Sequence, residues 1–141
     1  MAFDSTSPLL ALQSLCMALP GVQSVYVGVP KNFGTAVGVY ITVGAQLIED
    51  KANQLLQRRS RYLLTFGYAT GGNVQAAELA LAASADALIL ALYPLRDQSG
   101  HPLRNCELDL SLNDTAEYQT YTGQEYRRFP VVVTVIQQAN Y

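Results

Sequence analysis

Residues 73–93 read NVQAAELALAASADALILALY, the longest apolar segment of the chain and the one clearly of helix length. Asn73 follows two glycines and suits the N-cap position, because its side-chain oxygen can accept a hydrogen bond from the first helical turn. Pro94 lacks an N–H group and disfavours the helical conformation of the residue before it, so we predict that the helix ends at Tyr93. Leucine and alanine surround nearly the whole circumference, which predicts a helix buried on most of its sides.

This segment is also long enough to cross a bilayer, at about 1.5 Å per residue. Glu78 and Asp86 would each cost about 3 kcal/mol in hydrocarbon, and no basic flank sets an orientation. We therefore predict a core helix and no contact with a membrane.

The composition predicts a single domain, spanning residues 1–141, that associates with other copies. Charged residues make up 14% of the chain, well below the usual proportion of about one quarter, so a lone copy has little charged surface. The net charge of -2 argues against nucleic-acid binding spread over the whole domain. Cys16 and Cys106 are isolated and fit inert thiols in a reducing cytoplasm, and no secretion signal is predicted near Met1.

The rest of the chain alternates between strand patterns and turns. A first helix is predicted over residues 8–19, with Ser7 as its N-cap. Strands are predicted over residues 22–29, 36–43, 62–68, 106–112 and 124–138, and residues 115–122 are either a strand or an extended loop.

Two positions qualify this pattern. Residues 44–57 fit a short helix and an extended surface loop equally well. Pro130 lies inside the last strand and lacks a ladder donor, so it should occupy a bulge or an edge. The predicted fold class is α+β, with a mixed or antiparallel β-sheet packed by the N-terminal helix and the long buried Ala/Leu-rich helix.

The sequence contains few candidates for a nucleophile, a general base or a metal-ligand set. His101 stands alone in a Gly-Pro loop, without the spaced Cys, Asp or Glu of a metal site. Residues 66–73, FGYATGGN, lack the lysine of a P-loop and the three glycines of a dinucleotide site. Glu107 and Asp109 are explained by strand alternation. We predict no catalytic residue, no cofactor, no metal and no enzymatic activity.

Arginine and tyrosine carry the more informative pattern. Arg58, Arg59 and Arg61 lead into one strand, and Arg127 and Arg128 lead into another. Such groups contact phosphates, remain solvated at strand ends, or form ion pairs across subunit contacts, and we favour the ion pairs. Tyrosines on polar strands suit interfaces, because the ring buries area while the hydroxyl keeps a partner. The candidate oligomer interface comprises Arg58, Arg59, Arg61, Glu107, Asp109, Tyr118, Tyr121, Tyr126, Arg127 and Arg128.

The order of these elements, with RRSRYLLTFGY at 58–68 and EYRRFPVVVTVIQ at 125–137, resembles the tail-terminator (tail-completion) proteins of long-tailed bacteriophages. Minor head-to-tail joining proteins are similar too. The resemblance implies a virion subunit, assembled in the host cytoplasm, that forms a homo-oligomeric ring, expected to be a hexamer. The ring closes the head-proximal end of the tail tube and docks to the head connector, and DNA passes its lumen without sequence-specific binding. No catalytic residues come with the family.

Two alternatives stay open. One is a neck or head–tail joining protein of the connector complex. The other belongs to a different class, a small α+β dimeric ligand-binding protein or enzyme with an apolar pocket. Whether the arginines face a neighbouring subunit or the lumen also stays open at this point.

Overall fold

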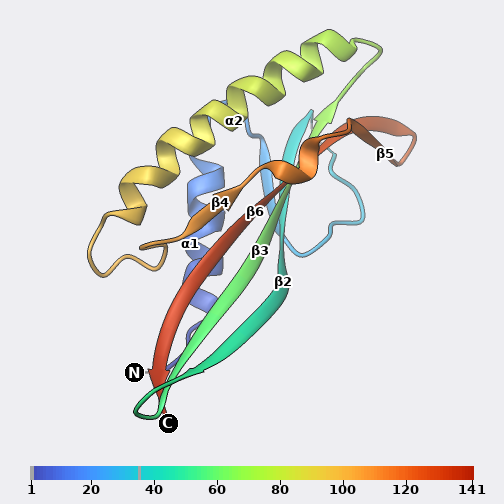
Figure 1. Ribbon diagram of the computed structural model, residues 1–141. Helices are drawn as coiled ribbons and strands as arrows, with labels where there is room; N and C mark the ends of the chain where they lie inside the picture. The colour runs from blue at the N-terminus through green and yellow to red at the C-terminus, as the bar shows by residue number, and fades with distance from the viewer. Residues whose placement is uncertain (1, 35) are drawn as a thin grey trace.

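The computed structural model describes residues 2–34 and 36–141. One six-stranded, mostly antiparallel sheet forms its body (Figure 1). The strand order is β1-β2-β3-β6-β4, and β5 pairs with β6 as well. In chain order the elements are α1 (Thr6–Met17), β1 (Ser24–Val27), β2 (Val37–Lys51), β3 (Leu55–Ala69), α2 (Val74–Arg96), β4 (Glu107–Asp109), the 3-10 helix η1 (Ser111–Asn113), β5 (Glu117–Tyr121) and β6 (Gln124–Asn140).

Both helices pack on one face of the sheet and share its core. Leu12 of α1 and Leu88 of α2 are fully buried against alternate residues of the central strands, such as Leu64 and Val131. Strand alternation produces this face, because every second side chain points to the same side of a sheet. The predicted α+β class and the mixed sheet are confirmed: β1 runs parallel to β2, and the other pairs are antiparallel.

Helix α2 begins as predicted but ends later. Asn73 caps it, since the Asn73 side chain accepts a hydrogen bond of 3.0 Å from the Ala76 N–H. The prediction that the helix ends before Pro94 is wrong, because the helix continues to Arg96. The hydrogen bond that Pro94 cannot make would go to the carbonyl of Leu90. Leu90 is exposed, so water can take that carbonyl, and the helix continues for only two more residues.

The prediction that α2 is buried on most sides is also wrong. Its buried residues form a single stripe, Ala77, Leu81, Ser84, Leu88 and Leu92. The physical reason is that only one layer, the sheet with α1, is available to cover the helix. On the outward side, Leu79 and Leu90 are 64% and 76% exposed. By its length and apolar composition, α2 is the one helix among those described that could cross a membrane.

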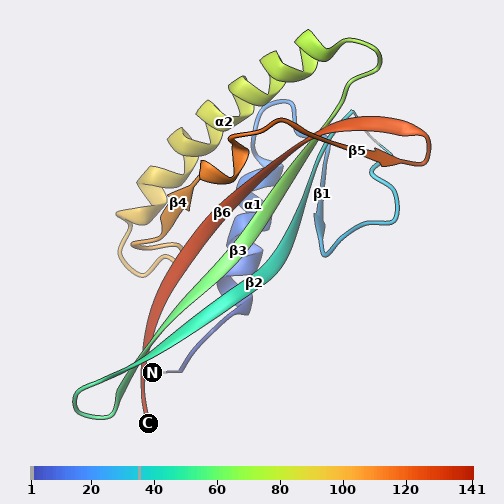
Figure 2. The same ribbon diagram turned by 45° about the vertical axis from the view of Figure 1, so that its right-hand side comes forward.

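Residues 44–57 form neither a helix nor a surface loop, so both alternatives weighed for them are wrong. Instead, β2 continues to Lys51 and β3 starts at Leu55, and Asn53 and Gln54 turn the chain with left-handed φ angles of 63° and 58°. A bulge lies between Val43 and Gln46. We call residues 46–60 and 135–140 the arm, a three-stranded extension whose tip lies beyond both helices (Figures 1 and 2).

Several boundaries differ from the sequence pattern. Helix α1 runs over Thr6–Met17, and Ser5 rather than Ser7 is at its N-cap position. The carboxylate of Asp4, one residue before, accepts the Thr6 and Ser7 backbone N–H groups at 3.0 Å. The strand predicted at 106–112 is reduced to Glu107–Asp109, because the Asp109 carboxylate accepts the Ser111 N–H at 2.8 Å and turns the chain into η1. Residues 115–122 contain a strand, β5, and the long final strand is confirmed.

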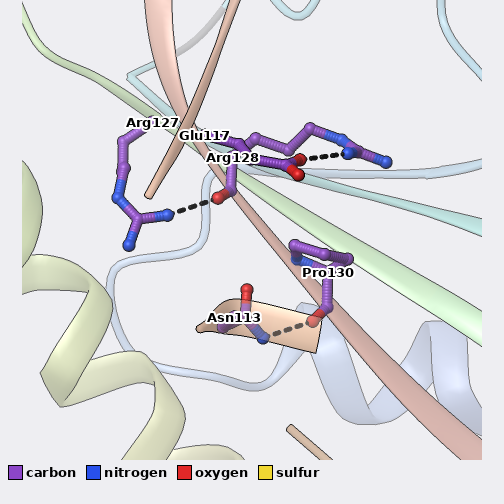
Figure 3. Close-up of polar contacts among 5 residues, drawn as sticks. All are labelled: Asn113, Glu117, Arg127, Arg128 and Pro130. Carbon is purple, nitrogen blue, oxygen red and sulfur yellow. Dashed lines mark hydrogen bonds and ion pairs between the residues drawn. The ribbon is translucent and has the colours of Figure 1, made fainter. Parts of the chain in front are cut away.

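Pro130 occupies the predicted edge position. It lies in β6 between the stretch paired with β4 and the stretch paired with β5, so no strand borders it on that side. The Pro130 carbonyl points into this gap and accepts a hydrogen bond of 2.6 Å from Asn113 Nδ2 (Figure 3). Since the nitrogen of a strand residue points the same way as its carbonyl, the missing N–H breaks no ladder bond.

A second cluster lies on the opposite face of the sheet and is aromatic. Phe33 is buried among the rings of Tyr26, Tyr40, Tyr121 and Tyr126, at centroid distances of 5.0 to 6.0 Å. A glycine beneath it makes this approach possible: a Cβ at Gly38 would lie 2.3 Å from Phe33 Cδ1. The contacts of the Phe33 ring therefore hold the loop after β1 against the sheet.

We expect Leu88→Asp and Leu90→Asp to differ sharply in stability. Leu88 is fully buried, so an unpaired carboxylate there should lower the free energy of unfolding by several kcal/mol. Leu90→Asp is the matched control one half-turn away, and it should change stability by less than about 0.5 kcal/mol. Urea unfolding followed by circular dichroism measures both. Equal losses would contradict the one-sided burial of α2.

Candidate assembly surface

Strand β3 separates its three arginines onto two faces. Arg58 lies on the helix side, where its guanidinium stacks 4.6 Å from the Phe3 ring centroid and donates to Gln137 at 3.0 Å. Arg59 faces the opposite side and pairs with Glu107 at 3.4 Å. Arg61 is exposed on that same side. The alternation of strand β3 produces this split.

Arg61 has an electrostatic effect on a nearby carboxylate. The pKa of Asp109 lies below its usual value, chiefly because the Ser111 side chain and backbone donate hydrogen bonds to it, and the charge of Arg61 adds to this. Asp109 thus stays ionised on a surface that also carries Arg59 and Glu107. We call these four residues the charged sheet face.

Arg127 and Arg128 are adjacent in sequence but serve opposite faces. Arg127 is nearly buried on the helix side, where its Nε lies 2.7 Å from Glu78 Oε1 of α2, and its Nη1 donates to the Arg128 carbonyl at 2.5 Å. Arg128 turns to the other side and pairs with Glu117 Oε2 of β5 at 2.6 Å (Figure 3). Arg127 therefore fastens α2 to β6, and Arg128 fastens β5 to β6.

Three of the five arginines therefore already meet a carboxylate of their own chain, namely Arg59, Arg127 and Arg128. The sequence could not show this, because the partners are 48, 49 and 11 residues away. Contact of these arginines with carboxylates of a neighbouring subunit stays a prediction. Arg61 is the arginine of this set best placed for such a contact, because its side chain is exposed.

The three tyrosines divide in the same way. Tyr121 and Tyr126 lie inside the aromatic cluster with Phe33, so their rings are buried before any partner binds. Tyr118 is exposed on β5. Tyr118 alone among these three offers a large ring to a partner.

Sequence reasoning missed the outer face of α2, which we define as Leu79, Leu90 and Tyr93. All three side chains are about half exposed or more and lie opposite the buried stripe, so they form an apolar surface on the outside of the molecule. A signal for it was present in the sequence. Gln75 and Asp86, two of the polar breaks in the helix, are both exposed and lie eleven residues apart, which is about three turns, so they mark one side as outward.

Among residues 2–34 and 36–141, no group of three His, Cys, Asp or Glu side chains gathers as a metal site would require. His101 Nδ1 accepts the Leu103 N–H at 3.1 Å and so has a local structural role. His101 also borders a hollow of about 540 Å³, whose lining includes the polar residues Arg104, Asn105 and Gln137.

Comparison with protein-family models finds no match, and a search of curated proteins finds none either. Among solved structures, the chain is similar to the sheath/tube terminator of an extracellular contractile injection system (PVC) in its extended state, with a TM-score of 0.51. The two share a fold. They are 13% identical, and the similarity covers 100% of this chain and 59% of the terminator chain. The chain thus spans about three fifths of the length of that terminator.

We expect Glu78→Ala and Glu117→Ala to have unequal effects on stability. Glu78→Ala leaves the nearly buried Arg127 without its carboxylate, which should cost about 1 to 3 kcal/mol, less than a fully buried pair because Glu78 is partly exposed. Glu117→Ala breaks a more exposed pair and should cost less than about 1 kcal/mol. Chemical unfolding measures the difference. If Glu117→Ala cost more, Arg127 would not be the attachment of α2.

We also expect both cysteines to resist thiol reagents in the folded protein. Burial raises the pKa of Cys16 to about 12, and it raises the pKa of Cys106 as well. Both thiols therefore stay protonated at pH 8, and neither side chain reaches solvent. Maleimide labelling followed by mass spectrometry should add no label to the native chain and two labels in urea. Rapid native labelling would contradict the burial of these thiols.

Proposed function

We propose that this chain is a structural subunit that forms a ring, closes the head-proximal end of a phage tail tube and docks it to the head connector. The observation that carries this proposal is the fold shared with a sheath/tube terminator. The resemblance of the order of elements, with residues 58–68 and 125–137, to phage tail terminators is consistent with it.

The surface of the chain supports a function based on association. A lone copy would expose the outer face of α2 to water, together with Leu47 and Ile48 of the arm. Exposed apolar surface of this kind marks sites of protein association. A subunit that works by joining neighbours needs such a surface, whereas an enzyme needs a pocket with convergent polar groups.

In the proposed assembly, the partners are further copies of the chain, the tail tube protein and the head connector. The ring is expected to be a hexamer, and DNA passes through its lumen without sequence-specific binding. The particle, a virion tail or neck, is then the final location. A contractile injection system is a second candidate, because the structurally similar protein caps the sheath and tube of such a particle.

Solution size and tube capping test this proposal. Native mass spectrometry should find a closed oligomer of about six copies, and negative-stain images should show a ring. Added to purified tail tubes of the same particle, the protein should bind one tube end and stop further growth. A stable dimer that binds no tube would support the ligand-binding alternative, and binding to an isolated connector without the tube would support the neck protein.

Arg61→Glu tests the arginine contacts within this proposal. Arg61 is exposed, so the reversal should leave the thermal midpoint within about 2 °C while it weakens ring formation at least about tenfold. Lys31→Glu is the matched control, because Lys31 is exposed and lies outside the predicted interface. Sedimentation at a series of concentrations measures assembly. A normal ring with altered passage of DNA would instead place Arg61 at the lumen.

A further inference from the structure

The arm has two outer strand edges, and over the described residues neither edge is covered by another strand. On one side, β1 pairs with β2 only over Gly38–Ile41 and leaves residues 46–51 of β2 without a strand partner on that edge. On the other side, β4 pairs with β6 only over Val132–Thr134 and leaves residues 135–140 without one. Unpaired edges of this length are templates for pairing with a further strand.

Hydrogen bonds that flank the arm show which residues of β6 face outward. The Glu125 carbonyl accepts the Thr70 N–H and the Tyr141 N–H donates to the Gln54 carbonyl, so odd-numbered residues of β6 face β3. The carbonyl of Pro130, an even-numbered residue, bonds in the opposite direction, to Asn113. Since the direction alternates along a strand, the free N–H and C=O groups at the outer edge of the arm belong to Ile136, Gln138 and Asn140.

The register gives the matching set on β2. In the two hydrogen bonds named above, the β3 partners are Gln54 and Thr70, so the backbone N–H and C=O groups of even-numbered residues of β3 face β6. Gln46, Ile48 and Asp50 are opposite even-numbered residues of β3, so their backbone groups face away from β3 and toward the outside. The arm therefore presents three outward residues on each edge.

The surroundings of the two edges complement each other. The edge of β6 borders the hollow of about 540 Å³, whose lining includes Ile136, Gln138, His101 and Arg104. Beside this edge, Arg104 supplies a positive charge and the hollow gives room for an extended segment. β2 ends in Glu49, Asp50 and Lys51, and Lys51 pairs with Glu49 at 2.8 Å. Asp50 accepts a hydrogen bond of 3.1 Å from the Tyr141 hydroxyl and belongs to none of the ion pairs of the described residues. The charge of Asp50 is opposite to that of Arg104, which favours contact between the two edges.

We propose that the β2 edge of one copy pairs with the β6 edge of the next copy, so that the sheet continues from subunit to subunit. This inference rests on the proposed ring and names the contact that closes it. Within the chain, β2 and β6 both run antiparallel to β3 and hence parallel to each other. Rotation about an axis along the arm keeps this direction, so the new pairing is parallel. The contact joins two different surfaces, and such a contact forms a ring when the rotation between neighbours closes, as the proposed ring requires. The closed ring then has no free arm edge.

Cysteine pairs on the two edges test the contact directly. Leu47 and Gln138 have exposed side chains on the same side of the sheet, and Ile136 and Asn140 lie two residues to either side of Gln138. We combine Leu47→Cys with Ile136→Cys, Gln138→Cys or Asn140→Cys in turn, which covers the neighbouring registers. Within one chain, these positions are two strand spacings apart, about 9.6 Å, which is too far for a disulfide.

After mild oxidation, at least one double variant should give a ladder of disulfide-linked chains that ends at the size of the closed ring. Each single variant is the control and should give no ladder, because one cysteine links two chains at most. Cys16 and Cys106 are buried and should add no links. A ladder limited to dimers, or the absence of any ladder in a protein that forms rings, would overturn the proposed contact.

Proline at an outward position tests the backbone bonds. Ile48→Pro and Gln138→Pro each remove an N–H that faces away from β3, so the monomer should keep its fold, as it tolerates Pro130. Ring formation should need about tenfold more protein, which corresponds to the loss of about one hydrogen bond. Thr120→Pro is the matched control, because Thr120 faces outward on β5, away from the arm.

The outcomes separate this inference from the proposed function. If Ile48→Pro and Gln138→Pro both form rings normally and no double cysteine variant gives a ladder, the edge contact is overturned. The proposal that the chain forms a ring would stand. A wild-type chain that stays monomeric, with no ladder in any double variant, would overturn both. A ladder together with weakened rings in the arm prolines, and normal rings in Thr120→Pro, supports the contact.

Discussion

The antiparallel ladder between β3 and β6 is the interaction on which the rest of the structure depends. It runs from Leu55 opposite Asn140 to Ala69 opposite Tyr126, and it borders every other strand pairing except that of β1 with β2. The ladder's alternating side chains also form the surface on which α1 and α2 pack. Because backbone hydrogen bonds do not require a covering layer, the ladder can continue into the arm, where the helices no longer cover the sheet.

A single covered face explains the surfaces that remain available. The two helices bury one face of the sheet, and a small aromatic cluster around Phe33 buries part of the other. The outer face of α2 and the arm therefore keep apolar side chains in contact with water. This arrangement suits a subunit that completes its packing against neighbours, which is consistent with the shared fold of a sheath/tube terminator and with the proposed ring.

The charged residues show how tertiary structure divides a sequence motif. Arg127 and Arg128 form one pair in the sequence, yet strand alternation sends one to Glu78 on α2 and the other to Glu117 on β5. Both ion pairs hold elements of the same chain together. The grouping of arginines did not reveal which charges already pair within the chain, and contact across subunits stays a prediction. In the same way, the abundance of tyrosine reflects in part an internal cluster.

Local patterns in the sequence determined the helix start at Asn73, the alternating strands, the edge position of Pro130 and the α+β class, because each depends on residues near in sequence. Tertiary structure alone decided three other features: the long hairpin at residues 44–57, the exposure of the outer face of α2 and the partners of the arginines. A hairpin needs a third strand, β6, to stabilise its weakly patterned residues, and β6 lies about 80 residues farther along the chain. Burial of a helix depends on how many layers cover it, and an ion pair depends on which strands become neighbours. Neither quantity is contained in a local stretch of sequence.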